Sequence, residues 1–341
     1  MDLHEIGTSQ MVFDESDVWL LYMVDDVVFY LRFILVVFGV PGNILTILVG
    51  TLSHNKKQTT SVYMIGLALS DASILLQAGI SAPMWRSNIV MFWPSRELEF
   101  KFVYFVAYAS AMTSGLVLAF MSVDRFVAIR YPLVAKRICT VTKAKVIVTI
   151  TAVIVVGANV STFFCHAFIK DSESGIELLI VSVPGHPVYE ILFTNFQMVF
   201  GSIVPAVIII CSNIGIIITM RQASRNRAKM REEQKQDGDK SDNQLTRILV
   251  VVSVAYFVTT LPYRLFLAAF GIPEVADMYD MKDPFWNILF NTLDHFLFGV
   301  WLCNHAVNFY LYCLAGGKRY REDTNMILVK LFRCFRATRE N

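Results

Sequence analysis

The chain has 341 residues, of which 55% are hydrophobic and 17% are charged, and its mean hydropathy is +0.52. Soluble domains carry about 25% charged residues, so this deficit excludes an ordinary soluble protein and indicates that lipid surrounds much of the chain. The net charge of +2 gives no reason to expect a nucleic-acid partner.

Seven apolar segments are long enough to cross a bilayer, which takes about 20 helical residues. They cover residues 27–52, 60–84, 102–126, 144–168, 191–219, 247–270 and 287–313. A large soluble helical protein would instead carry charged stripes at helical spacing, which these segments lack. The sequence therefore predicts an all-α membrane protein, a bundle of seven transmembrane helices over 27–313. We expect an acidic tail before it at 1–26, and an amphipathic interfacial helix with a short tail after it at 314–341.

The Lys and Arg residues predict the orientation, because they gather on the cytoplasmic side of a membrane. The segments around 53–59, 127–143 and 220–246, with Arg125, Lys145, Arg247 and the C-terminal tail, hold 23 of the 30 basic residues. We therefore expect a multi-pass protein of the cell membrane with an extracellular N-terminus and a cytoplasmic C-terminus. The first residues lack a basic region before a short apolar run, so we expect the first span to direct insertion without a cleavable signal peptide.

An acidic residue, Asp71, lies inside the second apolar segment in the run GLALSDASILL. A charged side chain at the centre of a bilayer costs about 2.5–3.5 kcal/mol on insertion scales, so it needs a reason. One interpretation is a carboxyl group that neighbouring helices hold without a ligand, and the other is a cation site or a protonation switch. Oxygen-bearing side chains in other spans would suit a small hard cation such as Na+. The sodium-site candidates besides Asp71 are Ser114, Asn304 and Asn308.

The third apolar segment ends with two adjacent charges of opposite sign, Asp124 and Arg125, followed by Phe126. This pair, the seven spans and the polar residues inside them together resemble the rhodopsin-like (class A) G-protein-coupled receptors over nearly the whole chain. The order and spacing of the motifs on successive spans make the resemblance specific. The motifs are GN (Asn43), LALSD (Asp71), DRF where the family has DRY, Pro205, Pro262, and NFYLY where the family has NPxxY.

The resemblance implies a role for the ion pair at the end of span 3. In this family the arginine is held by its aspartate neighbour and by an acidic residue at the base of span 6, and activation frees it to contact a heterotrimeric G protein. Asp242 lies where that acidic residue is expected, so we predict a contact between Arg125 and Asp242 in the inactive state. Asn308 and Tyr312 match the switch residues of span 7.

The chain also departs from the family pattern. Phe100 lies at about the position of the expected disulfide cysteine, and only Cys165 could approach the outer face, so we expect no extracellular disulfide within the chain. The usual tryptophan of span 4 is missing, Thr260 replaces the one before the span 6 proline, and Asn213 replaces a tyrosine of span 5. We therefore expect altered signalling efficiency, a different trigger, or loss of signalling.

Two missing residues and one sequence resemblance bear on the class of ligand. The amine-receptor aspartate is absent near Ala107, and the retinal lysine is absent near Leu302. The end of span 7, NHAVNFYLYCLAGGKRYRE, resembles invertebrate neuropeptide receptors of the FMRFamide and myosuppressin type. The first 30 residues contain seven acids and no Lys or Arg, and an acidic rim speeds the encounter with a cationic ligand. A small amidated peptide ending in Arg-Phe would fit, although the positive-inside rule alone also leaves acids outside.

The ligand-binding candidates lie in the outer parts of the spans. Aromatic rings there could hold apolar side chains of a ligand, and Asp294 could pair with a basic one. Arg264 could accept a carboxylate or neutralise Asp294. Aromatic residues near the ends of spans also serve as interfacial anchors. The candidates are Trp85, Tyr108, Asn195, Tyr263, Arg264, Asp294, His295 and Phe298.

The cytoplasmic segments predict contacts with lipid and protein. Residues 221–247 are dense in charge and could contact a G protein or anionic lipid. After span 7, apolar residues alternate with Lys and Arg in the pattern of an interfacial helix, which binds membrane lipids. Cys334 near its end is a palmitoylation candidate, with a free thiol as the alternative.

No catalytic residue is expected, because the chain has no Walker A sequence, no HExxH and no paired catalytic carboxylates. We expect no cofactor beyond an allosteric Na+. The predicted partners are an extracellular peptide, a heterotrimeric G protein and membrane lipids. One alternative is a chemosensory receptor of the same fold for environmental small molecules. The other is a transporter or channel, but the sequence shows no duplicated halves with broken helices, which would favour that class.

Overall fold

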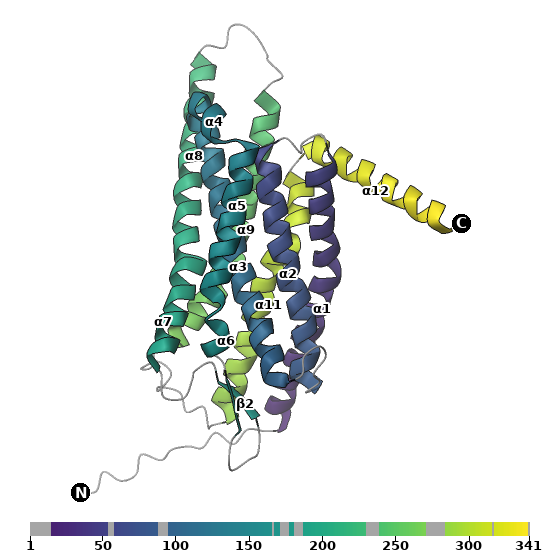
Figure 1. The fold of residues 1–341 in the computed structure, drawn as a ribbon, viewed down its shortest axis with the longest axis vertical. Helices are drawn as coiled ribbons and strands as arrows, with labels where there is room; N and C mark the ends of the chain where they lie inside the picture. Colours follow the sequence, from purple (N-terminus) through teal and green to yellow (C-terminus); the bar gives the residue numbers. More distant parts are fainter. Residues whose placement is uncertain are drawn as a thin grey trace, which may run out of the picture.

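The computed structural model describes residues 15–53, 58–87, 95–165, 167–170, 177–180, 187–229, 239–270, 284–315 and 317–339. Seven stretches of helix within these ranges are long and apolar enough to cross a membrane. They run side by side as one bundle (Figure 1), which confirms the predicted seven-helix membrane fold. The main helices are α1 (Glu15–Leu52), α2 (Thr59–Ser87), α3 (Arg96–Arg130), α5 (Val141–Asn159), α8 (Val204–Lys229), α9 (Asp239–Phe270) and α11 (Pro284–Ala315).

The two ends of the bundle differ. At the hairpin end, β1 (Ala167–Lys170) pairs antiparallel with β2 (Glu177–Ile180). At the opposite end lies the short helix α4 (Pro132–Ile138), and α12 (Gly317–Arg339) leaves the bundle sideways (Figure 1). We call this the α12 end. A separate C-terminal helix was predicted from its alternating apolar and basic residues, and α12 is that helix.

The fourth predicted span was too long. The sequence suggested helix to residue 168, but α5 ends at Asn159, a single turn follows as α6 (Thr162–Cys165), and β1 begins at Ala167. The hairpin was not predicted. An apolar run does not reveal which later segment its backbone will pair with, so hydropathy alone extended the helix into the strand.

The fifth span contains an irregular turn. It consists of α7 (Pro187–Met198), the π-helical turn η2 (Val199–Ile203) and α8. Pro205 follows this turn closely, and a proline has no N–H to continue the regular hydrogen bonding of a helix. Gly115 on α3 faces the turn, because a Cβ atom there would lie 3.4 Å from the carbonyl oxygen of Gly201. Gly115 therefore lies next to η2, at a distance where a Cβ atom would make an ordinary van der Waals contact.

Phe100 packs at the start of α3, where a disulfide cysteine was expected from the family pattern. Its side chain is fully buried next to the buried side chain of Val103, and Ile80 of α2 and Tyr104 pack against them. The first turn of α3 is capped, since the Ser95 hydroxyl accepts a hydrogen bond from the Leu98 amide at 3.2 Å. Apolar packing and this cap fix the start of α3 without a covalent link to it.

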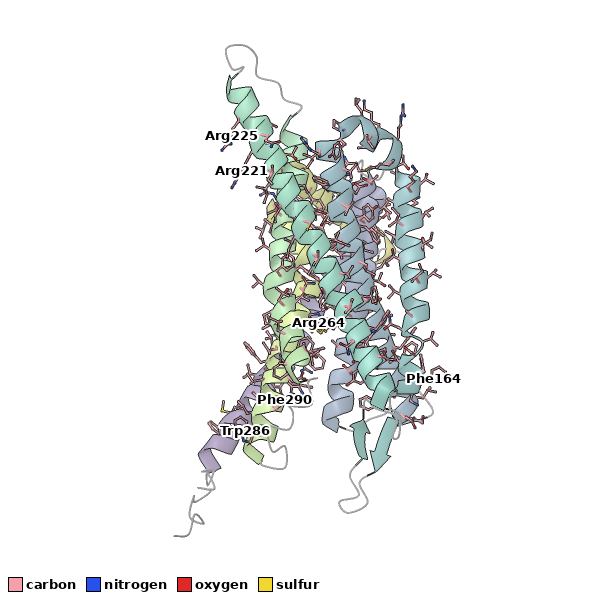
Figure 2. All side chains as sticks on the ribbon, turned by 90° about the vertical axis from the view of Figure 1, so that its left-hand side faces the viewer. Phe164, Arg221, Arg225, Arg264, Trp286 and Phe290 are labelled. Carbon is pink, nitrogen blue, oxygen red and sulfur yellow. The ribbon has the colours of Figure 1, made fainter. Side chains whose placement is uncertain are left out.

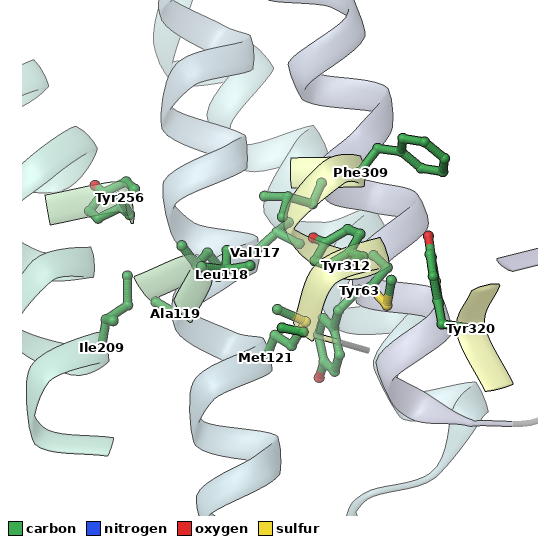
Figure 3. Close-up of a cluster of buried hydrophobic side chains, with 14 of the residues drawn as sticks. Tyr63, Val117, Leu118, Ala119, Met121, Ile209, Tyr256, Phe309, Tyr312 and Tyr320 are labelled. Carbon is green, nitrogen blue, oxygen red and sulfur yellow. The ribbon is translucent and has the colours of Figure 1, made fainter. Parts of the chain in front are cut away.

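The buried core forms several clusters along the bundle. A large buried cluster joins α1, α2, α3, α5, α8, α9, α11 and α12, and Figure 3 shows part of it. The close-up labels Tyr63, Val117, Leu118, Ala119, Met121, Ile209, Tyr256, Phe309, Tyr312 and Tyr320. Nearer the middle of the bundle, Gly39 brings α1 against two helices at once. A Cβ atom there would lie 2.7 Å from Leu75 Cδ1 on α2 and 2.9 Å from Ala306 Cα on α11.

Candidate functional site

A buried polar site surrounds Asp71 on α2. The carboxyl group is fully buried, and three side chains from two other helices reach it. Ser114 of α3 donates its hydroxyl hydrogen to Oδ1 at 2.8 Å, and Asn308 of α11 donates to Oδ2 from Nδ2 at 2.6 Å. His305 of α11 places Nδ1 2.7 Å from Oδ1. These bonds give the buried charge the partners that it requires in an apolar environment.

The sequence analysis named Asn304 among the sodium-site candidates and missed His305. Asn304 is buried, but it makes no hydrogen bond to Asp71 within the described part of the chain. His305 lies three residues before Asn308, so the two side chains share one face of α11. That spacing was a signal in the sequence that could have found it.

The groups around Asp71 are poorly suited to a sodium ion. A hard cation prefers several oxygen ligands that offer lone pairs. Here the contacts to the carboxylate are a donated hydroxyl hydrogen from Ser114, an amide N–H from Asn308 and an imidazole nitrogen from His305. Both carboxylate oxygens are therefore already bonded within the chain. The residues present do not fit the predicted cation.

Asn43 joins α1 to this site. Its Nδ2 donates to the carbonyl oxygen of His305 at 2.9 Å and to that of Gly39 at 3.1 Å. A side-chain amide that bonds the backbone of another helix fixes both the depth and the rotation of the two helices. The close approach at Gly39 and the Asn43 bond thus hold His305 in place from the α1 side.

A series of aromatic rings connects the ligand-binding candidates to the Asp71 site. Tyr263 of α9 and Phe298 of α11 have ring centroids 5.7 Å apart, and both contact Trp301, at 5.8 and 5.2 Å. The Trp301 ring in turn meets the His305 ring edge-on at 4.8 Å. Trp301 was not predicted as a site residue. The series runs from the outer candidates to the imidazole that holds Asp71.

The charged candidates lie beside these rings. The guanidinium group of Arg264 lies over the Trp301 ring, 5.8 Å from its centroid. Figure 2 labels Arg264 within the bundle, whereas Arg221 and Arg225 project from α8 at the α12 end. Asp294 interacts electrostatically with His295 and Arg32. Arg32 of α1 was not predicted as a site residue. It supplies positive charge near Asp294, a role that the sequence analysis suggested for Arg264.

The remaining candidates are placed differently. Tyr108 stacks on Tyr104 with centroids 5.9 Å apart and meets Phe193 of α7 edge-on at 5.3 Å. Asn195 of α7 is exposed. The side chain of Trp85 lies outside the described part of the chain, so its role stays a prediction.

A cavity of about 490 Å³ lies between α2 and α3. It is lined mainly by apolar side chains, with Gln77 and Glu99 among them, and by Leu76 and Phe102, which are exposed on the outside of the bundle. Among the ligand-binding candidates whose side chains the structure describes, none lines it. This cavity is therefore distinct from the group of rings around Trp301.

A second polar cluster lies where α3 reaches the α12 end. Arg125 donates to Oδ2 of Asp124 from Nη2 at 2.6 Å and from Nε at 3.2 Å, so the predicted neighbour pair is present. Thr59, the first residue of α2, completes the cluster. Its Oγ1 accepts from Arg125 Nη2 at 2.7 Å and donates to Asp124 Oδ2 at 2.8 Å. Thr59 was not predicted, because no motif marks it.

Three further predicted residues have different outcomes. Phe126 packs tightly on α8, since a Cβ atom on Gly215 would lie 2.5 Å from its ring. The side chains of Asp242 in α9 and Cys334 in α12 lie outside the described part of the chain. The Arg125–Asp242 contact and the palmitoylation of Cys334 therefore stay predictions.

Cys139, in the turn after α4, also contacts this cluster. Its thiol donates to the backbone carbonyl oxygen of Asp124 at 3.8 Å. Burial raises the pKa of the Cys139 thiol to about 11, and the Asp124 carboxylate adds to the rise. The thiol is therefore protonated at neutral pH.

Residues 42–312 match the sequence model described as 7 transmembrane receptor (rhodopsin family). The matched range contains both polar clusters and the rings around Trp301, and it covers most of the chain.

Proposed function

The chain belongs to the rhodopsin family of seven-transmembrane receptors, and we propose that its ligand is a short amidated neuropeptide of the FMRFamide type. As a member of this family it is a G-protein-coupled receptor in a membrane and not an enzyme. The ligand enters from the hairpin end, which is extracellular. The α12 end, with the exposed Arg221 and Arg225, faces the cytoplasm and the G protein.

The series of rings around Trp301 carries this proposal. A ligand among Tyr263, Phe298 and Arg264 contacts side chains that pack directly on Trp301. Trp301 packs on His305, which bonds Asp71. A change of ring packing at the ligand therefore reaches the buried polar site through direct contacts, which a receptor requires of its ligand site.

The peptide class rests on the chemistry of the candidate pocket and on the end of α11. Tyr263 and Phe298 offer aromatic surface to apolar side chains of a peptide. Asp294 offers a carboxylate to a basic side chain, in competition with Arg32 and His295. The sequence NFYLY at the end of α11 has the form found in invertebrate neuropeptide receptors, and the acidic first 30 residues favour encounter with a cationic ligand.

On the cytoplasmic side, Arg125 is the group that activation releases. Asp124 and Thr59 hold its guanidinium group in the described arrangement, and Asp242 provides a further contact in the inactive state. Releasing Arg125 from these acceptors frees its N–H groups for the G protein. Replacing Asp242 with alanine then raises basal signalling at equal surface expression, and an unchanged basal signal would remove Asp242 from the mechanism.

The test is a panel of G-protein activation sensors in cells that express the full chain. The cells are challenged with a library of amidated neuropeptides and with the same peptides as free acids. We expect a saturable response to an amidated peptide that disappears in Arg125→Ala but persists in Arg130→Ala, an exposed arginine at the end of the same helix. A response to small environmental molecules alone would overturn the peptide class and favour a chemosensory receptor.

A further inference from the structure

His305 lies beside Asp71, where the sequence predicted a cation. Its imidazole is 3% exposed, and Nδ1 lies 2.7 Å from the carboxylate Oδ1. Because an ionised carboxylate accepts hydrogen bonds and does not donate them, we assign the hydrogen of this contact to Nδ1. We propose that the His305 imidazole takes the place of a sodium ion at Asp71, so that the chain itself completes this site and the receptor does not respond to sodium.

The bonding of the carboxylate supports this proposal. Oδ1 accepts from Ser114 and His305, and Oδ2 accepts from Asn308. The N–H of the imidazole directs its positive end at the carboxylate and so supplies attraction that an ion would otherwise supply. A sodium ion at Oδ1 would have to displace this donor, and the imidazole offers it no oxygen ligand in return.

The imidazole is also held on its other sides. The ring of Trp301 lies edge-on to it at 4.8 Å, with an angle of 75° between the ring planes. The backbone oxygen of His305 accepts the amide of Asn43 on α1 at 2.9 Å. Turning the imidazole away from Asp71 would break the contact at Oδ1 and disturb the packing on Trp301. Moving the His305 side chain to admit an ion would therefore cost these contacts.

The consequence concerns both stability and signalling. A ligand that binds only the folded or only the inactive state stabilises that state by mass action. Without a sodium ion at Asp71, neither the stability of this receptor nor its basal signal depends on sodium. Removing the imidazole while keeping the carboxylate should create that dependence, because Asp71 and Ser114 then face a space that oxygen ligands and an ion can fill.

The test is thermal unfolding of the purified full-length receptor, which needs neither a peptide nor a G protein. The result therefore stands apart from the outcome for the proposed function. Melting is compared in sodium chloride and in choline chloride at equal ionic strength, about 150 mM. We expect the same melting temperature in both salts for the natural chain. Stabilisation by sodium of about 2 °C or more would overturn the proposal.

Variants test whether the imidazole is the cause. His305→Ser should melt higher in sodium than in choline by about 2 °C or more, and His305→Asn, which also offers an oxygen, should follow it. The double variant His305→Ser with Asp71→Asn should lose the sodium effect. If both single variants fold and neither responds to sodium, the imidazole does not substitute for the ion. If neither folds, the comparison of salts on the natural chain still decides the proposal.

Discussion

Thr59→Val should raise the basal activity of the receptor by releasing Arg125. Valine has nearly the shape of threonine but no hydroxyl group, so the change removes two hydrogen bonds and little packing. The lost bonds are the one that Thr59 accepts from Arg125 Nη2 at 2.7 Å and the one that it donates to Asp124 Oδ2 at 2.8 Å. Arg125 keeps its bonds to Asp124, so the change weakens the cluster without dissolving it.

The expected size follows from the burial of the cluster. Hydrogen bonds to charged groups contribute about 1.5–3 kcal/mol each in mutational series. The side chain of Arg125 is 15% exposed and that of Asp124 is 6% exposed, so water replaces part of what the threonine provided. We therefore expect Thr59→Val to destabilise the state that holds Arg125 by about 1–2 kcal/mol. The equilibrium between this state and the state with Arg125 released then shifts by about 5–30-fold towards release.

The assay is basal G-protein activation in cells, measured at equal surface expression. Thr60→Val is a matched control, because Thr59 and Thr60 are both 7% exposed and the Thr60 hydroxyl has no hydrogen-bond partner among the described residues. Thr59→Ser, which retains the hydroxyl, should behave like the natural chain. The reasoning is refuted if Thr59→Val leaves basal activity unchanged, or if Thr60→Val raises it equally.

Three further predictions concern packing and thiol chemistry. Gly39→Ala should destabilise the receptor by about 1–3 kcal/mol through overpacking. Gly157→Ala should not, because a Cβ atom at Gly157 would have no neighbouring atom within 4 Å. Thermal unfolding of both variants checks this prediction. Gly215→Ala should displace the Phe126 ring and alter G-protein activation without abolishing surface expression. Alkylation of Cys139 should be slow at neutral pH, and its rate should rise steeply towards about pH 11. The reason is that the pKa of the thiol is raised to about 11 and only the thiolate reacts. Labelling of Cys139 at pH 8 at the ordinary rate for an exposed cysteine would contradict this prediction.

The sequence determined the membrane class, the seven spans and the chain positions of the main motifs. These follow from local properties: the length of each apolar run, the distribution of Lys and Arg, and polar residues such as Asp71 that lipid does not tolerate without partners. It also placed Asp124 beside Arg125, because adjacent residues need no fold to bring them together. The amphipathic α12 was equally predictable, since its pattern lies within one helix.

Only the tertiary structure decided which residues complete the sites. His305 lies 234 positions after Asp71, and Thr59 lies 66 positions before Arg125. Such contacts depend on how each helix is rotated about its axis and how closely its neighbours approach, and small residues such as Gly39 decide that approach. Hydropathy locates a span along the chain but does not give its rotation. That is why the sequence predicted a cation beside Asp71, and the packed bundle placed an imidazole there.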